Sequence, residues 1–194
     1  QTSATFTADP TPDILDEDNE TVVATITAAT GATVNPDPNL ASASATITDN
    51  DTAPTIGDAT FSVSEEGLAN GLADTSGTPA DNTDSRSASG TLAVTGSGVA
   101  PLTIALPVTG LPATIGGTAI TWSHGANAAV LIGSAAGPTP VIQITLNGGS
   151  TTVSSGATSV SYAVELLAPI QHPTNNVEDL LSFSVGLTIS DGVN

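Results

Sequence analysis

Apolar residues recur at every second position in most of the periodic segments of this chain. The clearest run is 181–189, in which Leu, Phe, Val, Leu and Ile alternate with small or polar residues. Alternation at period two places one set of side chains on the buried face of a sheet. No stretch keeps a helical period over three turns, and Gly, Pro and Asn break the runs. The sequence therefore predicts an all-β fold of sandwiches built from short strands.

The expected strands fall into two groups. The first group has three strands in 52 residues, too few to bury the apolar face of a sandwich. We therefore expect residues 1–52 to be the C-terminal part of a preceding repeat, the alternative being a small domain that packs on its neighbour. We expect residues 53–57 to form a linker stiffened by Pro54, and residues 58–194 to form a complete sandwich. The expected strands are roughly 2–8, 20–28, 41–48, 59–64, 86–95, 99–108, 118–123, 128–134, 140–147, 158–167 and 180–190.

The charge of the chain excludes several classes of partner. Its 194 residues include 19 acids, one Arg (Arg86) and no Lys, for a formal net charge of −18. Binding to nucleic acid requires a cationic surface, and binding to anionic membranes is likewise disfavoured. There is no cysteine, so disulfides and thiolate metal sites are excluded. No apolar run approaches the ~18 residues of a membrane-spanning helix. We expect a monomeric extracellular protein stabilised by a cation.

The acids are concentrated in the first half of the chain. Fifteen of the 19 lie between Asp9 and Asp84, and such crowding is repulsive unless ions neutralise it. Two acidic runs flank the expected hairpin of the first group, so its return would bring them to one end. Calcium takes six to eight oxygen ligands in flexible geometry, which suits them better than magnesium. The alternative is a set of solvated loop acids. The candidate ligands are Asp16, Asp18, Glu20, Asp49, Asn50 and Asp51.

Several stretches carry a resemblance to known repeats. DEDNETVVATIT (16–27), followed by ASATITDND (43–51), resembles the end of a Calx-β-like, immunoglobulin-like repeat. FSVSEEGLANGLADTSGTPADNTDSRSASGTLAV (61–94), AITWS (119–123), YAVELLAPIQHP (162–173) and LSFSVGLTISDG (181–192) resemble the immunoglobulin-like repeats of giant RTX adhesins. These adhesins are secreted by bacterial type I systems. The chain departs from the pattern at 170–172 and 191–194, where acids of the family are missing.

The resemblance implies an immunoglobulin-like or cadherin-like β-sandwich and a structural role. The chain would be an extender module on the bacterial cell surface, rigidified by calcium at domain junctions. Its partners would be neighbouring repeats of the same chain, with a glycan or protein ligand held by adjacent domains. Such an adhesin serves cell adhesion and biofilm formation.

A second calcium site is expected at the far edge of the sandwich. Glu65 and Glu66 close the first strand of the second group, and Asp191 closes its last strand. In immunoglobulin-like sandwiches, part of the first strand runs parallel to the last. Glu65 or Glu66, Asp191 and a carbonyl near Gly192 would then meet at one edge. A pair of unrelated turn acids is the alternative.

Nothing in the sequence favours catalysis. No G-x-S-x-G motif is present, and His124 and His172 have no recognisable catalytic context. Sugar-processing clefts use aromatic platforms, whereas this chain has one Trp, one Tyr and three Phe. We therefore expect no enzyme. The alternative to the extender is a module that binds a glycan or peptide through loop 67–84, or a scaffold that hosts an inserted lectin-like domain.

Overall fold

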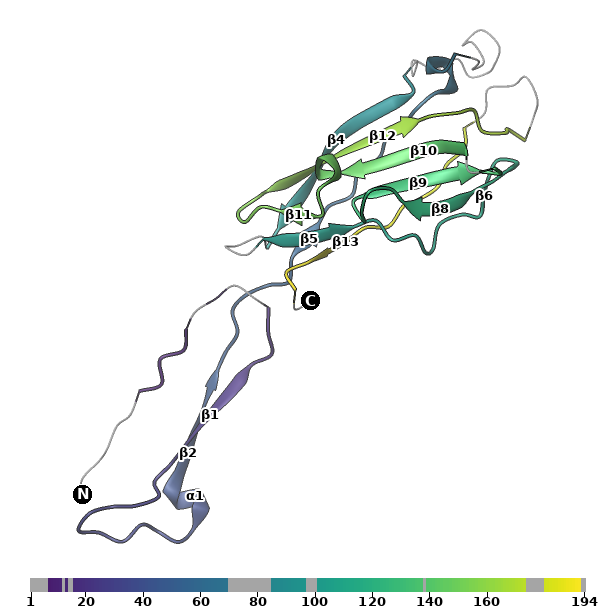
Figure 1. Cartoon of the computed structure of the whole chain (residues 1–194). Coiled ribbons are helices and arrows are strands. Elements are labelled where there is room, and N and C mark those ends of the chain that lie inside the picture. Colours follow the sequence, from purple (N-terminus) through teal and green to yellow (C-terminus); the bar gives the residue numbers. More distant parts are fainter. Residues whose placement is uncertain are drawn as a thin grey trace. The chain divides into compact units, whose positions relative to one another are not determined.

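The chain folds into two compact units, Gln1–Ala53 and Pro54–Gly192, here called unit 1 and unit 2. The computed structural model describes residues 7–11, 13, 16–69, 85–96, 101–137, 139–173 and 180–192 (Figure 1). Most of the strand expected at 2–8 and most of loop 67–84 lie outside these residues. The fold is all-β with antiparallel sheets, as the alternation predicts. No helix in the described part of the chain has the length and apolarity needed to cross a bilayer.

Unit 1 is an antiparallel hairpin of β1 (Glu20–Thr25) and β2 (Ser42–Ile47). A short turn of helix, α1 (Pro38–Ala41), precedes β2, and the Asp37 side chain caps it by accepting the Asn39 N–H. Apolar side chains here remain in solvent: Val23 is 63% exposed and Ile26 is 56% exposed. A two-stranded sheet without a covering layer is marginally stable.

Unit 2 is a β-sandwich whose larger layer is a six-stranded sheet of order β3-β4-β12-β10-β9-β8. The second layer contains a three-stranded sheet of order β11-β5-β13, and β6 and β7 form a separate hairpin. The bounds are β3 Thr55–Ile56, β4 Ser87–Thr95, β5 Leu102–Ala105, β6 Thr114–Ile115, β7 Thr118–Ala119, β8 Thr121–His124, β9 Val130–Ala135, β10 Thr139–Leu146, β11 Thr152–Val153, β12 Ser159–Leu166 and β13 Thr188–Ser190, with single 3₁₀ turns η1 Glu65–Gly67 and η3 Asn147–Gly149.

The core of unit 2 lies between the layers and follows the alternation of the long strands. In β4, Leu92 and Val94 are buried while their neighbours face solvent. In β10 and β12 most inward residues, such as Ile144 and Val164, are at most 4% exposed, and the inward Tyr162 is partly buried. These central strands are the ones that the sequence predicts most accurately.

Three expectations differ from the structure. Thr55 and Ile56, assigned to the linker 53–57, form strand β3 because they pair with Thr95 and Val94. The strand expected at 59–64 is an extended segment without ladder pairing, and of the strand expected at 180–190 only Thr188–Ser190 is paired. Side-chain alternation reports which face is buried, whereas strand assignment also requires a neighbouring backbone.

The first and last strands of unit 2 run in opposite directions and lie beside each other. β3 is antiparallel to β4, β13 is antiparallel to β5, and β13 contacts β3. Thr55 pairs with Thr95 at the end of β4, and Ser190 pairs with Thr103 near the start of β5. The chain therefore enters and leaves unit 2 at the same end of the sandwich (Figure 1).

Candidate functional site

The β1–β2 hairpin brings the two acidic runs of unit 1 together. Glu20 pairs with Ile47, so residues 16–19 and 48–51 continue past the same end of the ladder. The candidate residues Asp16 and Asp18 thus lie on one run, and Asp49, Asn50 and Asp51 on the other. Asp16, Asp49 and Asp51 are half-buried, whereas Asp18, Glu20 and Asn50 are exposed.

Asp49 is the centre of the contacts between the runs. Its Oδ2 accepts the Glu17 N–H at 2.9 Å, and its Oδ1 accepts the Asp51 N–H at 3.1 Å. The Asp49 N–H in turn donates to Asn19 Oδ1 at 2.8 Å. Each bond joins a backbone group to a side chain, and two of the three cross between the runs. Asn19 was not among the predicted site residues, although its place in the run DEDNE offered a signal.

The carboxylates around Asp49 influence one another. The carboxylate of Asp13, then partial desolvation, then the carboxylates of Glu20 and Asp49 raise the pKa of Glu17 above its usual value. Negative charge at this end of the hairpin therefore makes ionisation of a further acid unfavourable. A cation at the same place would relieve this repulsion.

The oxygen atoms at this end of the hairpin are suitable ligands for calcium. All are carboxylate, amide or backbone oxygens, the ligands that Ca²⁺ prefers. Each Asp49 oxygen accepts one N–H in these bonds, and a carboxylate oxygen has a second lone pair for a metal. Within the described ranges, however, no three Asp, Glu or His side chains are already gathered as a metal-binding group. Binding would therefore require the exposed side chains to converge.

The second predicted site does not form, because its residues lie at opposite ends of unit 2. Glu65 and Glu66 are in η1, close to the start of β4, where the Ser64 N–H donates to the Ser85 carbonyl. Asp191 follows β13, near the end of β4. The nine residues of β4 separate these ends, about 26 Å at ~3.3 Å per residue. The prediction was wrong because it took the first and last strands to be parallel.

Glu65 is instead tied to the loop that follows β12. Its Oε1 accepts the Ile170 N–H and lies 3.6 Å from His172 Nε2. The same loop is bound to the β6–β7 hairpin, since the Gly117 N–H donates to the Gln171 carbonyl at 3.0 Å. Glu65 and His172 thus fasten two loops at one end of the sandwich.

The other histidine bonds to a backbone carbonyl. His124 Nε2 donates to the Leu106 carbonyl at 2.7 Å, which connects β8 to the end of β5. The single Trp behaves similarly, because Trp122 Nε1 donates to the Pro112 carbonyl at 2.8 Å. The two rings therefore connect strand β8 to neighbouring loops by hydrogen bonds.

No known protein family, curated protein or solved structure matches this chain.

Proposed function

We propose that this chain is a structural extender module of a large secreted bacterial adhesin, rigidified by calcium where unit 1 ends. The observation that carries the proposal is the Asp49 carboxylate, which accepts backbone N–H groups from both acidic runs directly before the unit boundary after Ala53. Calcium would be held by oxygens of Asp16, Asp18, Glu20, Asp49, Asn50 and Asp51. The bound ion supplies positive charge that offsets the repulsion among these acids.

The remaining parts of the proposal follow from the composition and the resemblance. A net charge of −18 without cysteine suits an extracellular module that calcium stabilises in place of disulfides. We place it on the bacterial cell surface as a monomer, next to other repeats of its own chain. Its role there is to hold ligand-binding domains away from the cell during adhesion and biofilm formation, without catalysis of its own.

Calorimetric titration of calcium into the intact chain tests the proposal. Extracellular calcium modules bind with dissociation constants of ~10⁻⁴ to 10⁻³ M, and the double variant Asp49→Asn/Asp51→Asn should lose this binding. Asp37→Asn is the matched control, because it removes one charge at the other end of the hairpin, where Asp37 caps α1. Equal stoichiometry in the double variant and the wild type contradicts the proposal.

One observation favours a second role for unit 2. Because β3 and β13 lie side by side, the chain returns to the end of the sandwich at which it entered. Both connections of unit 2 then lie at one end of the sandwich, which leaves its opposite end remote from them. This arrangement suits a module that presents a binding surface, or a scaffold beside an inserted lectin-like domain.

Spin-label distances test that arrangement in solution. The chain has no cysteine, so two cysteines can be introduced and labelled without reaction at native thiols. The pair Thr55→Cys and Ser190→Cys should give a short distance, and the pair Leu68→Cys and Ser190→Cys a long one. Similar distances for both pairs contradict this placement of the two ends of unit 2, and with it the presenting role.

A further inference from the structure

The chain leaves the edge of β4 between Asp58 and Val63. On one side of this stretch the Gly57 N–H donates to the Ala93 carbonyl, and on the other the Ser64 N–H donates to the Ser85 carbonyl, both at 2.8 Å. Between them, Asp58–Val63 makes no backbone hydrogen bond to any other residue that the structure describes. We call Asp58–Val63 the arch. Within the described part of the chain, its backbone donors and acceptors therefore have no backbone partner.

A second extended stretch in unit 2, Leu180–Leu187, likewise lacks backbone hydrogen bonds to the other described residues. Every second residue is half-buried and the others are exposed, and Phe183 packs on Trp122 with ring centroids 5.7 Å apart. No backbone hydrogen bond joins this stretch to the rest of the described chain. One cause is Pro107, which lies two positions after the end of β5 and has no N–H to extend the ladder. Gly186 lies against its ring. We call Leu180–Leu187 the covering segment.

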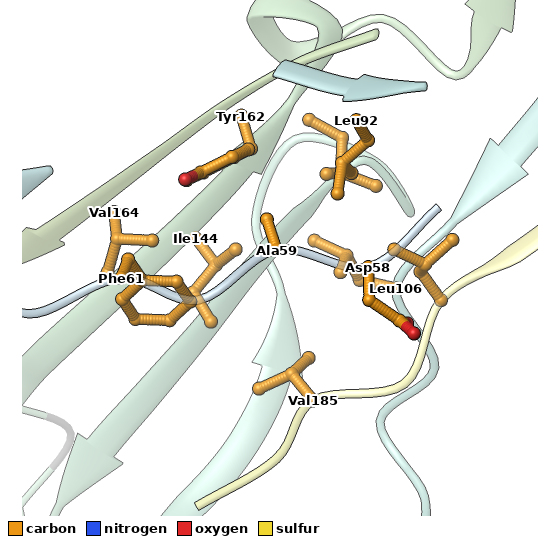
Figure 2. A pocket seen from close by; sticks show the side chains of 11 residues that line it. Asp58, Ala59, Phe61, Leu92, Leu106, Ile144, Tyr162, Val164 and Val185 are labelled. Carbon is orange, nitrogen blue, oxygen red and sulfur yellow. The ribbon is translucent and has the colours of Figure 1, made fainter. Parts of the chain in front are cut away.

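A cavity of about 80 Å³ opens between the arch and the covering segment. Figure 2 shows Ala59 and Phe61 of the arch and Val185 of the covering segment around it, with side chains of the six-stranded sheet behind. Phe61 remains 39% exposed although it lies against Tyr162, at a ring-centroid distance of 6.2 Å. The lining is apolar except for Asp58 and the Tyr162 hydroxyl, and the sheet contributes Leu92, Ile144 and Val164 to it.

The geometry of these two segments indicates what could occupy the space. Two extended backbones offer rows of N–H and C=O groups, and an extended polypeptide strand is the ligand that matches such rows repeatedly. The apolar cavity has room for one aliphatic side chain and would otherwise be poorly hydrated. Strand addition combines these two features, since main-chain bonds give affinity and a side-chain pocket gives selectivity.

The negative charge of this chain limits which kind of strand could bind in this space. Asp58 is the charged residue of the lining, and the whole chain carries a formal net charge of −18 with a single Arg. A second copy of this chain would be repelled, whereas a strand with Lys or Arg beside its apolar residue would be attracted. The occupant that fits best is therefore a basic, alternating strand from a different protein.

We propose that unit 2 binds an extended basic strand of a partner protein by β-strand addition between the arch and the covering segment. One aliphatic side chain of the strand enters the cavity, and a neighbouring Lys or Arg pairs with Asp58. This binding role goes beyond the extender function and does not depend on calcium.

Hydrogen exchange of the free, intact chain gives the first test. Amides of the arch and the covering segment should exchange rapidly, while amides of β4, β10 and β12 stay protected. Protection of both stretches in the free protein would mean that they already pair with this chain, and it would overturn the proposal.

Peptide binding gives the second test. The probe is a set of seven-residue peptides, Lys-Thr-Val-Thr-Xaa-Thr-Lys, with Val, Leu, Ile or Phe at Xaa. At least one should bind below about 1 mM and slow exchange in both stretches. Methylating two backbone nitrogens on one edge of that peptide should weaken binding about tenfold or more, because each lost hydrogen bond costs about three- to tenfold. No binding by the whole set, or equal binding by the methylated peptide, overturns strand addition.

Variants of unit 2 locate the bound strand. Asp58→Asn should weaken binding of the Lys peptide up to about fivefold at low salt, and Asp191→Asn, which removes an acid outside the cavity, should not. Val185→Trp should fill the cavity and weaken binding of the Leu peptide more than that of a peptide with Ala at Xaa. Peptide binding that is unchanged in both Asp58→Asn and Val185→Trp places the strand elsewhere and overturns the proposal.

Discussion

At the scale of single residues, Glu17 reports the repulsion among the acids of unit 1. Its pKa is raised, first by Asp13, so the folded hairpin favours protonated Glu17. This contribution to stability is fully present below the usual pKa of 4.5 and is lost as the pH rises through the raised value. At neutral pH the ionised Glu17 is therefore unfavourable for the folded hairpin.

Glu17→Gln should consequently stabilise the folded hairpin at pH 7 and slow its amide hydrogen exchange. Amides of β1 and β2 should exchange more slowly in this variant than in the wild type, and the difference should shrink at pH 4 or in 1 M salt. Asp37→Asn, at the other end of the hairpin, serves as the control. The same exchange rates for Glu17→Gln and the wild type at pH 7 would show that solvent screens these charges completely.

The sequence predicts the acidic end of unit 1 well because the information is local. Two acidic runs flank one hairpin, and a hairpin brings its flanks together whatever the rest of the chain does. The bond from the Asp49 N–H to Asn19 was missed because the prediction for the run at 16–20 considered only its charged residues. The pairing of Glu65 with the loop at Ile170 joins residues 105 positions apart, and no local pattern encodes it.

At the scale of elements, the sequence predicts a strand correctly where neighbouring strands pair with both of its edges. β10 lies between β9 and β12, so both its edges and its inner face are occupied. The covering segment has an equally regular alternation but no ladder partner among the described residues. β3, β6 and β11 have two residues each, too short for any periodicity. A segment is therefore a strand in the structure only where a neighbouring backbone pairs with it, whatever the alternation of its side chains.

The centre of β10 should accordingly be sensitive to truncation. Ile144 is 4% exposed, and Ile144→Ala should cost about 2–5 kcal/mol in the free energy of unfolding, because it leaves a cavity between the layers. Val23→Ala in β1 is the control; Val23 is 63% exposed, so the change should stay within about 0.5 kcal/mol. Chemical denaturation of both variants gives the comparison, and similar small losses would mean that the layers repack freely.

At the scale of the whole molecule, the two units should differ in stability. Nearly all buried apolar residues of the described chain lie in unit 2, whereas in unit 1 Ala41 alone is buried. Amides of β1 and β2 should exchange much faster than those of β4, β10 and β12 in the absence of calcium. Added calcium should slow exchange in unit 1 alone. Equal protection in both units without calcium would indicate that contacts beyond the hairpin stabilise unit 1.

The adjacent ends of unit 2 determine how it would respond to mechanical load. Tension applied through Thr55 and Ser190 pulls β3 and β13 away from their neighbours one hydrogen-bonded pair at a time, because the load does not act along a whole ladder at once. The ladders are short, since β3 has two paired residues with β4 and β13 has three with β5. Optical tweezers should record a lower unfolding force with handles at these residues than with handles at Leu68 and Ser190. Under tension applied at these two residues, this sandwich would therefore unfold at low force, and the released chain would lengthen and dissipate mechanical work.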